Sequence, residues 1–284
     1  MDQRSMPTMR SRRLGNELRD LRKASKLSAA QVAEHLGCGQ PKISKIENGE
    51  RGIRPADLCA LLDLYGVTDD KFRERIKQLA RDVYKVDWWT AQGPLIHDTL
   101  RDYLTLESDS SLIREYEHLL VPGLLQSEGY MREIFFPALP KERAEALIEA
   151  RLARKRLLDD HLGFRLRAVI DEPALHRMPG GRAVAVEQLT HLDEVSIRPN
   201  VTIQVLPLKV RLPLNQYVPF GLYTLRGTKS INVVWLEHLE SGTLLEQKES
   251  VKEYTQAWEE LTAAAMSPSA SRKFIQGLIE EYQR

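Results

Sequence analysis

Apolar residues in the first third of the chain recur at the spacing of amphipathic helices. Leu14, Leu18 and Leu21 stand at i, i+4 and i+7 within SRRLGNELRDLRKAS, which places them on one face of a helix. RPADLCALLDLYG and DDKFRERIKQLARDVY, further along, have the same helical pattern. Together with the stretch described next, they predict five short helices, which form an all-α domain over residues 1–85.

The stretch LSAAQVAEHLGCGQPKISKIENG, residues 27–49, predicts two short helices joined by a glycine turn. Ser28 followed three residues later by Gln31 has the sequence of a capping box, in which side chains satisfy free N–H groups at a helix start. Gly37 supplies the left-handed residue that ends the first helix, and Pro41 fits the first turn of the second. The apolar residues of both helices face a common core: Val32, Ala33, Leu36, Ile43 and Ile46.

Between residues 86 and 111 the pattern is irregular, and WWTAQGP is its clearest break. We therefore expect a linker in this segment. Paired tryptophans beside Gly-Pro favour an anchor on a domain surface, and an aromatic ligand-binding box is the alternative.

Residues 112–284 alternate between helical and strand periods, which predicts an α+β domain. FRLRAVID and NVTIQVLPL have the pattern of strands, and GRAVAVEQLTHLDEVS between them has that of a helix. Strand, helix and strand in this order fit a parallel βαβ unit. FGLYTL and INVVWLE, joined by RGTK, predict a β-hairpin. Further helices are predicted at KERAEALIEARLARKRLLDD and, at the C-terminal end, at EQKESVKEYTQAWEELTAAA and SPSASRKFIQGLIEEY.

Composition narrows the class of protein. The 284 residues are 42% hydrophobic and 29% charged, and no apolar run approaches the roughly 18 residues of a membrane span. The basic N-terminal residues are not followed by the apolar stretch of a secretory signal. Two cysteines, Cys38 and Cys59, fit a reducing compartment, and neither belongs to a zinc-binding pattern. We expect a cytoplasmic protein without a membrane segment, a metal site or another cofactor.

Charge is distributed unevenly along the chain. Residues 1–85 contain 18 Lys and Arg against 12 Asp and Glu, a net charge of +6. The remaining residues contain 23 against 28, a net charge of −5. This distribution favours an N-terminal domain that binds a polyanion and a C-terminal domain that does not.

Acidic and imidazole groups at two places in the C-terminal domain could form an acid–base site. Asp171, Glu172 and His176 follow a predicted strand, and Glu237 with His238 follows another. Asp171 before Glu-Pro is more typical of a helix N-cap, and adjacent carboxylates in loops are more often solvated charges than catalysts. The chain contains no GxSxG, P-loop or GxGxxG motif. We therefore expect no catalytic residues and no enzymatic activity.

The second helix of residues 27–49 has the polar outer face that a DNA-reading helix needs. A helix fits the major groove, whose floor displays different donors and acceptors for each base pair. An amide can bond adenine, and an ammonium group can bond guanine or a phosphate. The residues predicted to contact bases are Gln40, Pro41, Lys42, Ser44 and Lys45. The residues predicted to contact the sugar-phosphate backbone of DNA are Arg12, Arg13, Gln31, Asn48, Arg51 and Arg54.

Arg22, LSAAQVAEHLG and ISKIENG, in this order and spacing, resemble the phage-repressor-like (Cro/C1, XRE-type) helix-turn-helix family. The resemblance implies a lambda-repressor-like five-helix head and a partly buried structural ion pair between Arg22 and Glu47. The family's base-reading positions fall on Gln40, Pro41 and Lys45. The family often has a phosphate-binding glutamine where this chain has Ala29, and Gln31 would take over that contact.

A second resemblance covers most of the C-terminal domain. REYEHLLVPGLLQSEGYMREIF, VIDEPALHR and SVKEYTQAWEELTAAAMSPSAS are similar to sequences of the WhiJ-type, antitoxin-like developmental regulators of actinobacteria. This resemblance implies a regulator, often encoded beside a small partner protein that binds it and changes its affinity for DNA.

The sequence thus predicts a nucleoid-associated, DNA-binding transcriptional regulator, acting in development or secondary metabolism. A homodimer on a palindromic operator is expected, because one short helix reads only a few base pairs. The alternative is an antitoxin-like interaction module that sequesters a small partner and binds DNA only for autoregulation. An enzyme fused to a DNA-targeting head is a third, more distant alternative.

Overall fold

The computed structural model describes residues 8–84, 98–160, 163–210, 218–226, 231–238 and 242–284. The chain divides into two compact units, which are described separately. The first unit contains the helices up to α5, and residues 100–105 cluster with it. The second contains a sheet with its covering helices.

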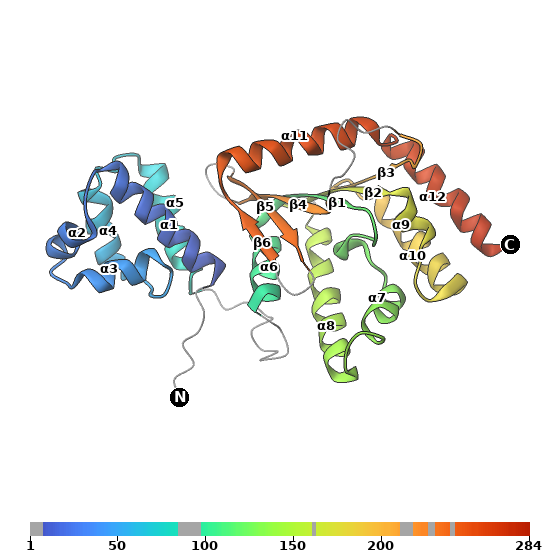
Figure 1. Cartoon of the computed structure of the whole chain (residues 1–284), viewed down its shortest axis with the longest axis horizontal. Coiled ribbons are helices and arrows are strands. Elements are labelled where there is room, and N and C mark those ends of the chain that lie inside the picture. The colour runs from blue at the N-terminus through green and yellow to red at the C-terminus, as the bar shows by residue number, and fades with distance from the viewer. Residues whose placement is uncertain (1–7, 85–97, 161–162, 211–217, 227–230, 239–241) are drawn as a thin grey trace. The chain divides into compact units, whose positions relative to one another are not determined.

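The first unit is built from short helices, α1–α5 (Figure 1). Their bounds are α1 Met9–Ala24, α2 Ala29–His35, α3 Gln40–Glu47, α4 Pro55–Leu64 and α5 Asp70–Asp82. Leu18, Val32, Leu62 and Ile76 are at most 1% exposed and lie in one apolar core. A fully buried side chain of this size contributes roughly 1.5–3 kcal/mol. The core is therefore what holds helices of fewer than 20 residues in place.

The second unit is a six-stranded mixed sheet, with strands in the order β3-β2-β1-β4-β5-β6. The strands are β1 Ser110–Glu117, β2 Arg165–Asp171, β3 Val201–Leu206, β4 Phe220–Leu225, β5 Ile231–Glu237 and β6 Gly242–Leu245. β1, β2 and β3 are parallel, and β4, β5 and β6 pair antiparallel. β2 and β3 pair from Leu166↔Val201 to Asp171↔Leu206, with α9 and α10 between them in sequence.

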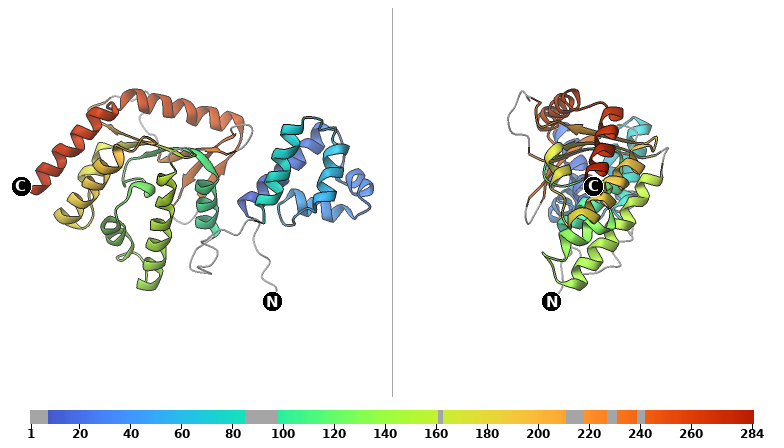
Figure 2. Two further views of the ribbon diagram at one scale, coloured as in Figure 1. Left: turned by 180° about the vertical axis from the view of Figure 1, so that it is seen from behind. Right: turned by 90° about the vertical axis from the view of Figure 1, so that its right-hand side faces the viewer.

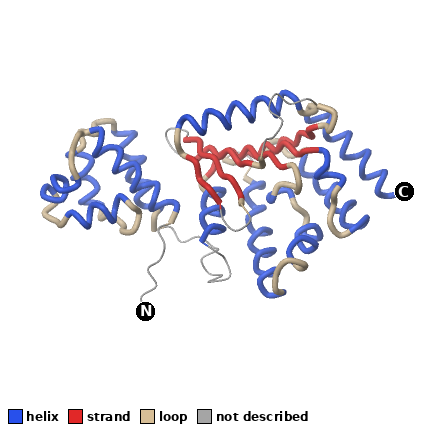
Figure 3. The backbone as a smooth tube through the Cα atoms, in the orientation of Figure 1, coloured by secondary structure: helices blue, strands red, loops and turns tan. Residues whose placement is uncertain are grey.

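Helices cover both faces of this sheet (Figures 1 and 3). Their bounds are α7 Glu128–Phe135, α8 Lys141–Arg154, α9 Glu172–His176, α10 Gly181–Ser196, α11 Lys248–Ala264 and α12 Pro268–Gln283, with 3₁₀ turns at Gly123–Leu125 and Lys155–Asp159. Helix α6, Asp98–Ser108, precedes β1, and its residues 100–105 cluster with the first unit. α11 lies on one face, where Trp258 and Leu261 pack on Tyr116, Val169 and Leu222. Figure 2 shows α7, α8 and α10 on the opposite face from two further directions.

The described part of the predicted linker, residues 98–111, forms regular secondary structure. Residues 85–97, which include WWTAQGP, lie outside the described residues, as does most of the RGTK turn. From Asp98 the chain forms helix α6, and β1 begins at Ser110. The pattern of apolar residues also predicts neither β1 nor β6, although β1 lies in the middle of the sheet.

Candidate nucleic-acid interface

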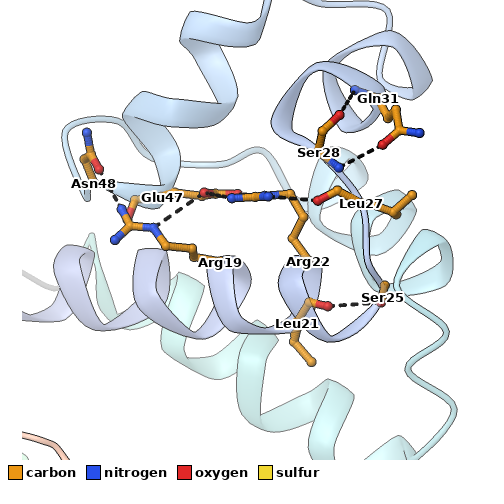
Figure 4. A network of polar contacts seen from close by, with 9 residues as sticks. All are labelled: Arg19, Leu21, Arg22, Ser25, Leu27, Ser28, Gln31, Glu47 and Asn48. Atoms are coloured by element: carbon orange, nitrogen blue, oxygen red, sulfur yellow. Dashed lines mark hydrogen bonds and ion pairs between the residues drawn. The ribbon is translucent and has the colours of Figure 1, made fainter.

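Two short helices, α2 and α3, meet through a tight turn in the first unit. The Ser28 side chain accepts a hydrogen bond from the Gln31 N–H at 3.2 Å, and the Ser28 N–H donates to Gln31 Oε1 at 2.8 Å (Figure 4). This capping box satisfies the start of α2. After α2, Gly37 has a φ of +59°, the left-handed conformation that glycine adopts without strain. The turn therefore ends α2 and lets α3 begin at Gln40.

The inner face of α3 is fixed to the core of the unit. Ile43 and Ile46 are 2% exposed, and α3 packs against both α1 and α2. Pro41 lies in the first turn, where its missing N–H costs no hydrogen bond. These contacts leave the opposite face of α3 to solvent.

The C-terminal end of α3 is tied to α1 by an ion pair (Figure 4). Arg22 donates to the Glu47 carboxylate through Nε at 2.6 Å and Nη2 at 2.9 Å, and through Nη1 to the Leu27 carbonyl at 2.8 Å. The bonds to Glu47 raise the pKa of Arg22, and Glu47 is itself buried. The arrangement is the structural pair that the first resemblance implies for Arg22 and Glu47.

Arg19, which is not among the residues predicted from the sequence, binds the same end of α3. Its Nη2 donates to the Glu47 carbonyl at 2.8 Å and to Asn48 Oδ1 at 2.6 Å. Arg19 precedes Arg22 by three residues, so both lie on one face of α1. That spacing is the signal by which the contact could have been found.

Two glycines bring the backbones of α1 and α3 into direct contact. A Cβ on Gly15 would lie 2.5 Å from the Glu47 carbonyl oxygen, and one on Gly49 would lie 2.6 Å from the Arg12 nitrogen. Gly49 also has a φ of +76°. At these two points no side chain separates the backbone of α1 from that of the end of α3.

The outward residues of α3 fall into two groups. Gln40, Pro41 and Lys45 are exposed and Ser44 is partly exposed, and no described residue bonds the side chains of Gln40 or Lys45. Lys42, which the sequence groups with them, instead donates to Asp57 Oδ2 at 2.7 Å. Four of the five predicted base-contacting residues therefore form the accessible face, and Lys42 is bound beside it.

The residues predicted to contact the DNA backbone differ in their availability. Arg51 is exposed and bonded by no described residue, and Arg54 is 78% exposed although it pairs with Asp57. Arg12 forms an ion pair with Asp102, which belongs to the same compact unit, and Arg13 is partly buried. The two amides are engaged within the unit, Gln31 in the capping box and Asn48 with Arg19.

The acidic residues considered for catalysis have local partners in the second unit. Asp171 is the N-cap of α9, Glu172 Oε2 accepts from the Leu208 N–H at 2.9 Å, and His176 lies 3.5 Å from the Glu172 carboxylate. His238 lies 3.0 Å from the Thr243 hydroxyl.

Within the described ranges no cluster of His, Cys, Asp and Glu side chains could hold a metal ion. None of the described helices combines the length and apolar character needed to cross a membrane.

The helix pair, its fixed inner face and its polar outer face define a helix-turn-helix protein. Residues 13–74 match a family model described as a helix-turn-helix domain. Residues 100–277, more than half of the chain, match the model of a domain of unknown function (DUF5753), and the chain belongs to that family.

One curated relative shares the first region. The chain is 49% identical over 48 residues to the uncharacterized HTH-type transcriptional regulator RghRB of Bacillus subtilis (strain 168). The match covers 16% of this chain and 34% of that protein. No solved structure matches the chain. These findings support a regulator of the XRE-like helix-turn-helix class, and the WhiJ-type resemblance of the C-terminal domain stays a prediction.

Proposed function

We propose that the protein is a sequence-specific, DNA-binding regulator of transcription that places α3 in the major groove. One observation carries the proposal: α3 is fixed from inside by Ile43, Ile46 and the Arg22–Glu47 pair, while its other face is polar and accessible. A helix held in this way can present side chains to base edges in one register.

The outward side chains suggest how the contacts are divided. Gln40 can bond adenine through its amide, and Lys45 can bond guanine O6 and N7. Ser44 and Pro41 complete the surface that meets the bases. Lys42 is assigned no base, because Asp57 binds its ammonium group.

Arginines around the helix pair would hold the sugar-phosphate backbone. Arg51 and Arg54 are the most accessible of them, and Arg13 lies nearby on α1. The amide nitrogen of Gln31 can still donate to a phosphate, because its capping bond uses the oxygen. Contacts of this kind fix the register and carry no sequence information by themselves.

The protein is proposed to act as a homodimer on a palindromic operator. Useful specificity needs two recognition helices on half-sites about 34–36 Å apart. On the basis of the WhiJ-type resemblance, we also propose that a small protein encoded by the adjacent gene binds this regulator. The regulator would act at the nucleoid, in development or secondary metabolism. The rival proposal is an antitoxin-like module whose main task is to sequester that partner.

Footprinting on the protein's own upstream region, with and without the product of the adjacent gene, tests these proposals. Protection of a palindrome with steep salt dependence is expected for the regulator. Protection that appears or disappears when the partner is added would favour the antitoxin-like module. A protein that binds every duplex equally, or none, would contradict sequence-specific regulation.

A further inference from the structure

Asp57, on α4, binds the side chain of Lys42, one of the residues of α3 that the sequence predicts to contact DNA. Its Oδ2 accepts from Lys42 Nζ at 2.7 Å, and its Oδ1 accepts from Arg54 Nη2 at 3.1 Å. Lys42 lies on α3, so this ion pair joins the proposed recognition helix to α4. Lys42 and Asp57 are 15 residues apart, and no local sequence pattern indicates the contact.

The two cations bound to Asp57 differ in accessibility. The Lys42 side chain is 19% exposed and the Asp57 side chain 13%, whereas the Arg54 side chain is 78% exposed. Arg54 can therefore reach a phosphate from its present position. The ammonium group of Lys42 can do so only after leaving Asp57.

The carboxylate of Asp57 is well suited to keep its charge. The hydrogen bond from Lys42, and after it the bond from Arg54, lower the pKa of Asp57 below its ordinary value. Asp57 also lies in the first turn of α4, where the helix dipole favours a negative charge. These effects favour the charged form of the Asp57 carboxylate, which is the form that binds the Lys42 ammonium group.

We propose that Asp57 sets the specificity of the DNA interface by keeping Lys42 away from DNA. This inference rests on the proposed function. A free lysine at this position would be a mobile point charge able to find a phosphate in many registers, and such contacts strengthen binding to every sequence. With Lys42 bound, α3 meets DNA through Gln40, Ser44 and Lys45, whose contacts depend on the bases.

The test measures binding of the full chain to operator and unrelated duplexes over a range of salt concentrations. Asp57→Asn is expected to add one phosphate contact, which steepens the slope of log K against log salt by about 0.9. On unrelated DNA, its gain should then be about threefold larger at 50 mM than at 200 mM salt. The ratio of operator to unrelated binding should fall.

Three further variants isolate the cause. Asp63→Asn removes one acidic charge from the same helix, at a side chain that pairs with Arg73, so it controls for net charge alone. Asp57→Glu keeps the carboxylate and is expected to bind like the wild type. Lys42→Met in the Asp57→Asn background should abolish the gain.

The single substitution Lys42→Met decides the matter even if Asp57→Asn does not fold. An unchanged salt slope supports the inference, because the wild-type ammonium already makes no DNA contact. A slope shallower by about one phosphate contact would overturn it, as would an equal gain in Asp57→Asn and Asp63→Asn. If the wild type binds no duplex, the proposed function itself is wrong, which is a separate and recognisable result.

Discussion

At the scale of single residues, Glu47 shows how an acidic side chain can belong to the helix that is proposed to face DNA. Its carboxylate is buried against Arg22, and Arg19 binds its carbonyl group. An exposed carboxylate at this point would repel phosphates. Because Arg22 compensates the charge of Glu47, this residue can hold α3 against α1 without repelling DNA.

Substitution of the two outermost polar residues tests the proposed reading face. Gln40→Ala and Lys45→Ala should each weaken operator binding by about 1–3 kcal/mol and relax the base preference, because each removes a base-edge contact. Titration against the operator and single-base variants measures both effects. Lys77→Ala, on α5 and paired with Glu74, is the matched control and should leave the preference unchanged. Wild-type affinity in both test variants would refute the reading face.

We expect two glutamates of β1 to make the stability of the second unit depend on pH. Burial is the main cause that raises the pKa of Glu115 to about 8, and nearby Glu107 adds to it. Burial likewise raises the pKa of Glu117 to about 9, with Glu115 as the next cause. The folded state therefore retains protons that the unfolded state releases near pH 4.5.

The sign of the pH effect follows from this difference. Between about pH 5 and 8 the unfolded state binds fewer protons, so the free energy of unfolding falls by about 1.4 kcal/mol per pH unit for each such group. Hydrogen exchange of the sheet amides measures this fall. Glu115→Gln, which is neutral at every pH, should flatten it, and Glu249→Gln on α11 should not. A wild-type profile without any decline would disprove the raised pKa values.

At the scale of elements, α2 depends on its cap because a helix of seven residues is marginal by itself. Ser28→Ala removes the side-chain acceptor and should lower the free energy of unfolding of the first unit by about 1 kcal/mol. Denaturant unfolding monitored by helical circular dichroism measures the loss. Ser28→Asp keeps an acceptor and should restore stability; equal losses in both variants would show that the cap is not the cause.

The spacing of apolar residues predicted the helices and strands in which buried positions recur at a regular interval. It did not predict the elements in which buried positions follow no such interval. β3, with five of its six residues buried, and the amphipathic helices α8 and α10 follow simple patterns. β1 does not, because SSLIREYE places Arg114, Glu115 and Glu117 in a strand that the sheet encloses on both sides. Arg114 bonds Thr224 and Asn232 of neighbouring strands, and burial raises the pKa of both glutamates, so these environments arise only in the folded chain.

The candidate interface was predictable to a similar degree. The inward and outward faces of α3 follow from helical geometry, which is local. The Lys42–Asp57 and Arg12–Asp102 pairs join separate helices, so no pattern within one helix could indicate that these cations are already bound. The sequence therefore predicts which residues face outward, but not which of them remain available.

At the scale of the whole molecule, the proposed dimer makes the spacing of its DNA sites testable. Inserting five base pairs between the half-sites turns one of them by about half a helical turn, and operator affinity should fall toward that of a single half-site. Gel-shift titration of the altered operators measures the loss. An insertion of ten base pairs returns both half-sites to the same side of the duplex and is the control. Equal affinity for all three spacings would show that two linked recognition helices are not required.

The glycine contacts between α1 and α3 have a consequence for how such a protein can diverge. At Gly15 and Gly49 the backbones touch without an intervening side chain, so the direction of α3 does not depend on the residues that would meet DNA. Gln40, Ser44 and Lys45 can therefore be exchanged while the docking angle is inherited unchanged. Under the proposed function, a few outward substitutions would change the operator that is recognised, whereas a larger residue at either glycine would alter every contact of α3 with DNA at once.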